Sequence, residues 1–194
     1  MHVTRPMLED TTVRYTIETQ KSTFVVKAFS TGLLSAFGHS PNIAIRDFRG
    51  DVHFTPGEPL GRAQLSVSIR ADSLECVDDI PEKDRQDIHR RMHGEVLETD
   101  RFPEIVYECS SVTGSGNGDR FWATLNGELT LHGMTRSLPV SARVVITGDS
   151  LRASGEFAVR QSDYEIGLVS AAAGTIRVKD ELKCRFDILA SKQD

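Results

Sequence analysis

The chain contains little of what would indicate a disulfide-bonded, metal-binding or redox-active protein. Three of its 194 residues are cysteines, Cys76, Cys109 and Cys184, which are widely spaced and odd in number. No C-x-x-C pair is present, so neither a zinc motif nor a redox motif is indicated. We therefore expect three reduced thiols, no metal and no cofactor in a chain of single-domain length.

Clusters of basic residues and long apolar runs are also missing. The formal net charge is −5, whereas a nucleic-acid partner requires a basic surface for its phosphates. No apolar stretch reaches membrane-spanning length, and residues 1–12 contain Arg5, Glu9 and Asp10 in place of an apolar signal sequence. The sequence predicts a cytoplasmic protein with no nucleic-acid partner and no integral membrane segment, in which residues 1–12 are an N-terminal extension.

The chain is rich in the alternation of apolar and polar residues that is typical of strands. Leu125, Leu129 and Leu131 share one face of such a segment, and Thr124 and Thr130 lie on the other. Comparable alternation predicts strands near residues 13–17, 24–28, 43–54, 63–71, 104–113, 120–131, 136–146, 151–161 and 182–190. Consecutive antiparallel strands in this number favour closure, because closure removes the sheet edges. We predict a mainly β protein, a lipocalin-like antiparallel β-barrel of about eight strands with one or two short helices capping its ends.

Glycines indicate where the strands bend or turn. Gly50 lies inside the strand near 43–54 and predicts a bulge or a bend there. Gly114, Gly116 and Gly118 predict the hairpin that follows the strand near 104–113.

One amphipathic helix is predicted from Pro81 to about Leu97, where Ile88, Met92 and Val96 recur every four residues. This apolar stripe is narrow, which favours a helix lying across one end of the barrel. His89 and His93 are also four residues apart, the minimum geometry for a divalent metal, but no third ligand is nearby. A solvent-facing role for both histidines is therefore favoured.

Several motifs occur in an order that resembles one known family. They are G-x-L-T-L-x-G-x-T at residues 127–135, F-P-x-I-x-Y at 102–107, F-x-G-x-V-x-F at 48–54, and an element at 155–166 containing Asp163 and Ile166. Together they resemble the YceI-like, polyisoprenoid-binding family over about residues 13–190. Lys21 and Glu165 depart from the family pattern, which more often has histidine and glycine at these places.

The resemblance implies one YceI-like barrel domain over residues 13–191, with a tunnel occupied by a long isoprenoid or acyl chain. The residues expected to line this lumen and bind the ligand are Phe24, Val26, Ala28, Phe37, Ile105, Tyr107, Leu129, Leu131, Ala142, Phe157, Val159, Phe186 and Ile188. The alternative is that these side chains simply fill the barrel as a core.

The segment of residues 30–41 is an apolar insertion relative to the family. Leu33, Leu34 and Phe37 at helical spacing indicate either a lid over the barrel mouth or a plug in its end. His39 is a candidate contact for a ligand headgroup, and His132, at a turn between strands, is interpreted as structural.

No catalytic arrangement is evident in the sequence. A nucleophile elbow and a paired-carboxylate site are missing, and Ser40 beside His39 is the nearest approach to a catalytic pair. The leading hypothesis is a non-enzymatic protein for binding, transport or sequestration of a polyisoprenoid, a quinone tail or a fatty-acyl compound. The alternatives are a structural or protein-interaction barrel with a filled core, for which a homodimer stays open, and a small hydrolase or isomerase using His39.

Overall fold

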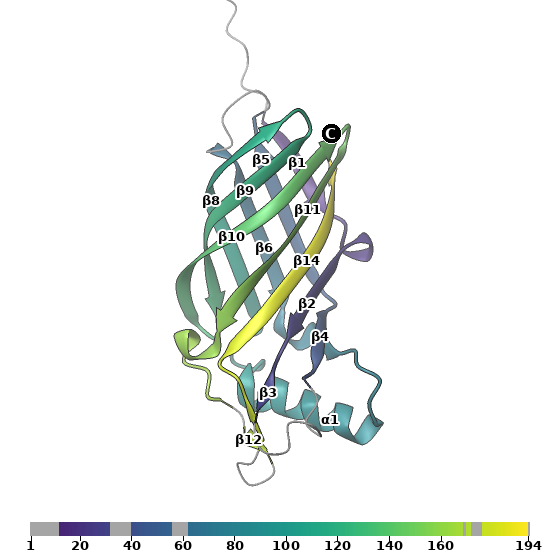
Figure 1. Ribbon diagram of the computed structural model, residues 1–194, viewed down its shortest axis with the longest axis vertical. Helices are drawn as coiled ribbons and strands as arrows, with labels where there is room; N and C mark the ends of the chain where they lie inside the picture. Colours follow the sequence, from purple (N-terminus) through teal and green to yellow (C-terminus); the bar gives the residue numbers. More distant parts are fainter. Residues whose placement is uncertain (1–11, 32–39, 56–61, 169, 172–175, 194) are drawn as a thin grey trace, which may run out of the picture.

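The computed structural model describes residues 12–31, 40–55, 62–168, 170–171 and 176–193 (Figure 1). Its strands are β1 (Val13–Ile17), β2 (Thr23–Lys27), β3 (Ser30–Thr31), β4 (Asn42–Ile45), β5 (Phe48–Phe54), β6 (Gln64–Arg70), β7 (Leu74–Cys76), β8 (Glu104–Asn117), β9 (Arg120–Leu131), β10 (Met134–Thr147), β11 (Ser150–Arg160), β12 (Ser170–Ala171), β13 (Ile176–Val178) and β14 (Glu181–Lys192). Its helices are α1 (Glu82–Arg91), the π-helical turn η4 (Met92–Val96) and the short 3-10 helices η1 (Thr19–Lys21), η3 (Ala71–Ser73) and η5 (Gln161–Tyr164).

The predicted eight-stranded antiparallel barrel is confirmed. The hydrogen-bonded order is β1-β5-β6-β8-β9-β10-β11-β14, and β14 pairs with β1 to close the ring. In Figure 1 the β8–β9 turn and the end of β14 lie at one end of the barrel, which we call the upper end. Helix α1 lies at the opposite end, which we call the lower end.

Three strands are interrupted at the same level of the barrel. Helix η1 separates β1 from β2, two residues separate β4 from β5, and η3 separates β6 from β7. Hydrogen bonds join the breaks: the Thr19 hydroxyl donates to the Phe48 carbonyl at 2.5 Å, and the Asp47 N–H donates to the Ser73 hydroxyl at 3.1 Å. Below this level β2, β4 and β7 continue the sheet from β14. Among the described strands, β7 pairs with β4 alone, so its other edge faces no strand.

The glycine predictions were partly wrong. Gly50 pairs in regular register with Val67, so of the two predicted features, a bulge or a bend, β5 has no bulge there. The register shift falls instead in β8, between Cys109 and Ser111. Strand β8 runs on to Asn117, so it includes Gly114 and Gly116, and only Gly118, with a φ of 64°, lies in the turn itself.

The lower end is closed by additional elements. Strands β3, β13 and β12 form a separate three-stranded sheet there, and α1 with η4 lies along β7 (Figure 1). Ile88, Met92 and Val96 of this helix pack against the buried core, as their spacing predicted. Within the described residues, no helix is both long and apolar enough to cross a lipid bilayer.

Candidate ligand-binding cavity

The upper half of the barrel encloses a cavity of about 160 Å³. Its walls come from the inward-facing residues of the eight barrel strands, and the surface that faces the space is apolar throughout. At its upper end the lining includes Ala63, Phe121 and Ile146, and at its lower end it reaches Phe24 and Phe157.

Small side chains explain why space is present at this level. Ala123 and Ala142 face one another across β9 and β10, and Ala153 and Ala190 lie on the neighbouring strands β11 and β14. These methyl groups stand where other levels of the barrel carry leucine, isoleucine or phenylalanine. A barrel of eight strands is near the size at which its side chains just fill it, so small residues on four neighbouring strands leave a cavity.

Glycines in the walls shape the same space. A side chain at Gly127 would collide with the Tyr107 ring, and one at Gly155 would collide with the ring of Phe186. Both aromatic rings can therefore lie flat against the barrel wall instead of crossing the lumen.

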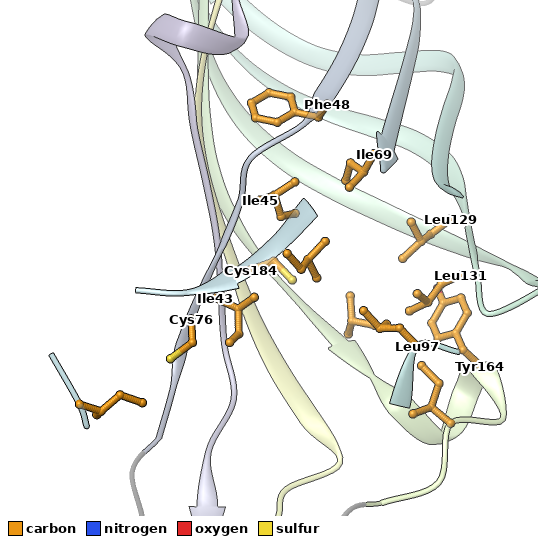
Figure 2. Packing of buried hydrophobic residues seen from close by; sticks show 14 residues of the cluster. Ile43, Ile45, Phe48, Ile69, Cys76, Leu97, Leu129, Leu131, Tyr164 and Cys184 are labelled. Atoms are coloured by element: carbon orange, nitrogen blue, oxygen red, sulfur yellow. The ribbon is translucent and has the colours of Figure 1, made fainter. Parts of the chain in front are cut away.

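The lower half of the barrel is filled. Figure 2 shows Ile45 of β4, Phe48 of β5 and Leu131 of β9 in a cluster of fourteen buried residues. Ile69 and Leu129 of this cluster also line the cavity above it. Burial of each such side chain stabilises the fold by about 1.5–3 kcal/mol. The barrel is therefore hollow above and solid below.

Aromatic rings form the floor between the two halves. The Phe24 ring lies 6.1 Å from that of Phe157, 6.3 Å from that of Phe186 and 6.4 Å from that of Phe48, centroid to centroid. Their edge-to-face arrangement is the favourable one for aromatic pairs. Three of these rings line the cavity, and Phe48 belongs to the lower cluster.

Tyr107 brings a hydroxyl group into this apolar interior. The hydroxyl oxygen lies 3.0 Å from the carbonyl oxygens of both Leu125 and Leu138. It has one hydrogen, which it donates to one of them at a time. Burial raises the pKa of Tyr107 far above its usual value, so this group stays neutral and makes its hydrogen bond to the barrel wall.

The structure divides the predicted ligand-binding residues into three groups. Those that line the cavity are Phe24, Tyr107, Leu129, Ala142, Phe157, Phe186 and Ile188. Val26, Ile105, Leu131 and Val159 face the interior lower down, where they pack in the filled cluster. Ala28 lies below them, with its N–H bonded to the Pro41 carbonyl, and does not line the cavity.

Phe37 and His39 lie outside the described residues, together with Leu33 and Leu34. Ser40, considered beside His39 as a catalytic pair, is described, and its hydroxyl oxygen accepts the Ser30 N–H at 3.3 Å.

Sequence reasoning missed most of the upper lining. The missed residues include Ile17, Val52, Phe54, Leu65, Phe121, Leu125, Val144, Ile146 and Leu151. All except Ile17, which ends β1 beside η1, continue the period-two pattern toward the upper ends of the strands. The inward alanines beside them were the available indication of free space.

His89 and His93 are not solvent-facing, contrary to the sequence-based expectation. The Cys76 N–H donates to His89 Nε2 at 2.9 Å, and Arg85 donates to the Cys76 carbonyl at 2.7 Å. His93 is hydrogen-bonded to the backbone of Leu74. Arg85, His89 and His93 thus form hydrogen bonds with backbone groups on the edge of β7 that faces no strand.

The spacing of the helix matches that of the strand. Four helical residues advance about 6 Å, and two strand residues advance about 6.6 Å. Residues spaced by four on the helix can therefore reach every second residue of β7. The two histidines spaced by four thus bond the backbone of an edge strand. Among the described residues, no group of three or more His, Cys, Asp or Glu side chains could hold a metal ion.

Burial changes the pKa of the His93 ring. Burial lowers the pKa of its ring, nearby His89 lowers it further, and the hydrogen bond to Leu74 opposes both. Its Nδ1 is buried without a hydrogen-bond partner among the described residues. The neutral ring is therefore the form that this position favours.

His132 joins three elements at the lower end. Its Nδ1 lies 3.2 Å from the Tyr164 carbonyl of η5, and its Nε2 lies 3.0 Å from a carboxylate oxygen of Glu98, just after η4. Both partners are acceptors, so only the protonated ring satisfies both contacts. Burial would raise the pKa of Glu98, but hydrogen bonds from His132 and Arg101 outweigh it and lower this pKa.

A comparison with protein families matches residues 15–190 to the YceI-like domain. The chain belongs to the YceI-like family. Curated relatives of this YceI-like chain include a UPF0312 protein of Shewanella sp. (strain W3-18-1), 30% identical over 103 residues, which are 53% of this chain and 48% of that protein. The chain thus spans about half the length of the curated relatives that it matches.

Solved structures share the YceI-like fold at low sequence identity. BcnA of Burkholderia cenocepacia has a TM-score of 0.68 and 16% identity, with 90% of this chain and 99% of that chain covered. A polyisoprenoid binding domain from Saccharophagus degradans has a TM-score of 0.66 and 12% identity, with 92% and 98% covered. At these identities the likeness shows the fold alone.

Proposed function

We propose that this protein binds a long apolar ligand, such as a polyisoprenoid, a quinone tail or a fatty-acyl compound, in the upper half of its barrel. The protein would bind, transport or sequester this ligand without catalysing a reaction. The observation that carries the proposal is the cavity, which has apolar walls throughout and an aromatic floor. The polyisoprenoid-binding domain among the fold neighbours supports this class of ligand.

The cavity has room for about one isoprene unit of a longer chain. An engineered apolar cavity of about 150 Å³ in another protein holds a single benzene molecule, and the space here is comparable. Burial at about 0.8 kcal/mol per carbon gives about 4 kcal/mol for one isoprene unit. Association costs about 4–15 kcal/mol, so tight binding requires several units, part of which must displace wall side chains or extend from the upper end.

The chemistry of the walls argues against catalysis at this place. The titratable side chain that lines the cavity is Tyr107, whose raised pKa keeps it neutral and whose hydroxyl bonds the backbone. General acid–base catalysis needs a group that exchanges a proton near the working pH. A carrier or sequestering role needs no such group.

Native mass spectrometry of protein purified without detergent, followed by organic extraction, tests the proposal. We expect an adduct whose extracted mass corresponds to a prenyl or acyl lipid, and saturable uptake of a fluorescent prenyl or fatty-acyl probe after the lipid is removed. A bare protein mass combined with no probe uptake would contradict the proposal and favour the alternative, a structural or interaction barrel. Release of a chemically altered product would favour an enzyme.

A further inference from the structure

The outer wall of the upper end carries an exposed aromatic side chain among arginines. Trp122 of β9 is 70% exposed and is the one tryptophan in the chain. It lies directly opposite Arg143 of β10, and Arg120 and Val145 form the next pair on the same face. We call Arg120, Trp122, Arg143 and Val145 the Trp122 patch.

Of the two arginines of the Trp122 patch, one has no carboxylate partner among the described residues and the other has a single long ion pair. Arg143 is exposed and makes no hydrogen bond or ion pair with any described residue. Arg120 has its sequence neighbour Asp119 at 3.9 Å. By contrast, Arg152 on the adjacent strand is held by Asp187 through two bonds of 2.8 and 2.7 Å. The patch is thus locally positive in a chain with a net charge of −5.

The Trp122 patch is continuous with the cavity through the same strand. Phe121, the residue before Trp122, faces inward and lines the upper part of the cavity. Its ring occupies the place that a side chain at Gly116 would take. The segment of β9 that presents Trp122 to solvent therefore also forms the wall of the lumen.

We propose that the Trp122 patch docks the barrel on an anionic lipid surface, from which the apolar ligand enters. Tryptophan prefers the boundary between headgroups and acyl chains, and arginine pairs with anionic headgroups while its stem covers apolar surface. A ligand that is almost insoluble in water resides in a bilayer, so a docking surface beside the cavity shortens its transfer. The entry of ligand rests on the proposed function, whereas the docking itself does not.

The single tryptophan makes the proposal directly measurable. Vesicles of phosphatidylcholine with added phosphatidylglycerol should shift the Trp122 emission to shorter wavelength and shield it from acrylamide. Phosphatidylcholine vesicles should cause a much smaller shift, and high salt should reverse the effect because it screens the arginines. Flotation of the protein with the anionic vesicles provides a second, independent readout.

Charge variants test the role of the arginines. Each Arg→Glu change in the patch, Arg120→Glu and Arg143→Glu, should weaken binding to anionic vesicles by at least about fivefold. Arg49→Glu is a matched control, because Arg49 is an exposed arginine on β5, across the barrel from β10. It should leave vesicle binding within about twofold of the unchanged protein.

The possible outcomes separate docking from ligand binding. Uptake of a fluorescent prenyl probe supplied from ethanol, without vesicles, should be the same in the patch variants as in the unchanged protein. Vesicle binding without probe uptake would support docking and contradict the proposed function. Equal binding to both kinds of vesicle, no binding, a shift that depends only on protein concentration, or quenching by an oligonucleotide in place of vesicles would overturn the docking proposal.

Discussion

Filling the cavity should block the ligand and stabilise the barrel at the same time. Ala142 is 2% exposed, lines the cavity and faces Ala123 across the strand pair. The substitution Ala142→Leu adds three carbons that point into the space. At about 0.8 kcal/mol per buried carbon, the gain in the free energy of unfolding has an upper limit of about 2.4 kcal/mol.

For a chain of this length that gain corresponds to a rise in Tm of about 5–10 °C. The assay is thermal unfolding of the lipid-free protein together with titration of a fluorescent prenyl probe. We expect Ala142→Leu to raise Tm and to abolish saturable uptake, because the leucine occupies the space that the probe requires. Ala158→Leu is the matched control, since Ala158 lies on the exposed face of β11 and does not line the cavity.

Two results would refute this reasoning. A fall in Tm with unchanged probe affinity would show that the wall at Ala142 has no room and that the probe binds elsewhere. Equal loss of uptake in Ala158→Leu would show that the effect does not depend on the cavity.

Three further measurements follow from the interior. Tyr107→Phe removes the donor to a buried carbonyl and should lower the free energy of unfolding by about 1–3 kcal/mol, measured by urea denaturation, with unchanged affinity for an apolar probe; a larger loss of affinity than of stability would contradict the structural role of the hydroxyl. The pKa of His93 is lowered in the folded protein, so the unfolded chain takes up a proton at a higher pH than the folded one. The free energy of unfolding should therefore be full above about pH 6.5 and fall as the pH drops below it. His93→Gln should show a shallower dependence of this free energy on pH below about 6.5, and an identical dependence would refute the assignment. Burial raises the pKa of Cys109, and that of Cys184 to about 12, so both thiols should resist alkylation at neutral pH until urea unfolds the protein; rapid labelling of the native protein would contradict their placement.

The period-two alternation was sufficient to predict the barrel. Strands β9 to β11 and β14 begin and end close to the predicted limits, because each carries a long, regular pattern with one apolar face, whereas β8 runs four residues beyond its predicted end. The turn between β9 and β10 is also indicated locally, because Gly133 has a positive φ of 75°, which suits a residue without a side chain. Local sequence therefore determines most of the wall.

The division of the barrel into a hollow and a filled half could not be predicted in the same way. Alternation shows that Leu129 and Leu131 both face inward, and both belong to the buried cluster, but Leu129 also lines the cavity and Leu131 does not. The difference depends on what the opposite strands contribute at each level, and on the aligned breaks at η1 and η3. Those breaks arise from contacts between distant segments, such as that from Thr19 to Phe48.

The roles of the histidines depended on tertiary contacts as well. Nothing near His89 in the sequence shows that an edge strand with an unpaired N–H at Cys76 will lie beside it. His132 shows the same limit, because its two acceptor partners come from segments more than 30 residues away on either side.

The side chains that cover the edge of β7 protect this barrel from aggregation at that edge. An open strand edge is a template for the addition of a strand from another molecule, and aggregation begins at such edges. Here the edge is covered by helix side chains: Arg85 and His89 bond the backbone of Cys76, and His93 bonds that of Leu74. Displacement of α1 would therefore expose the edge of β7, while the pairing of β14 with β1 keeps the ring closed. Misassembly of this protein would therefore start at its most densely packed end and not at the hollow one.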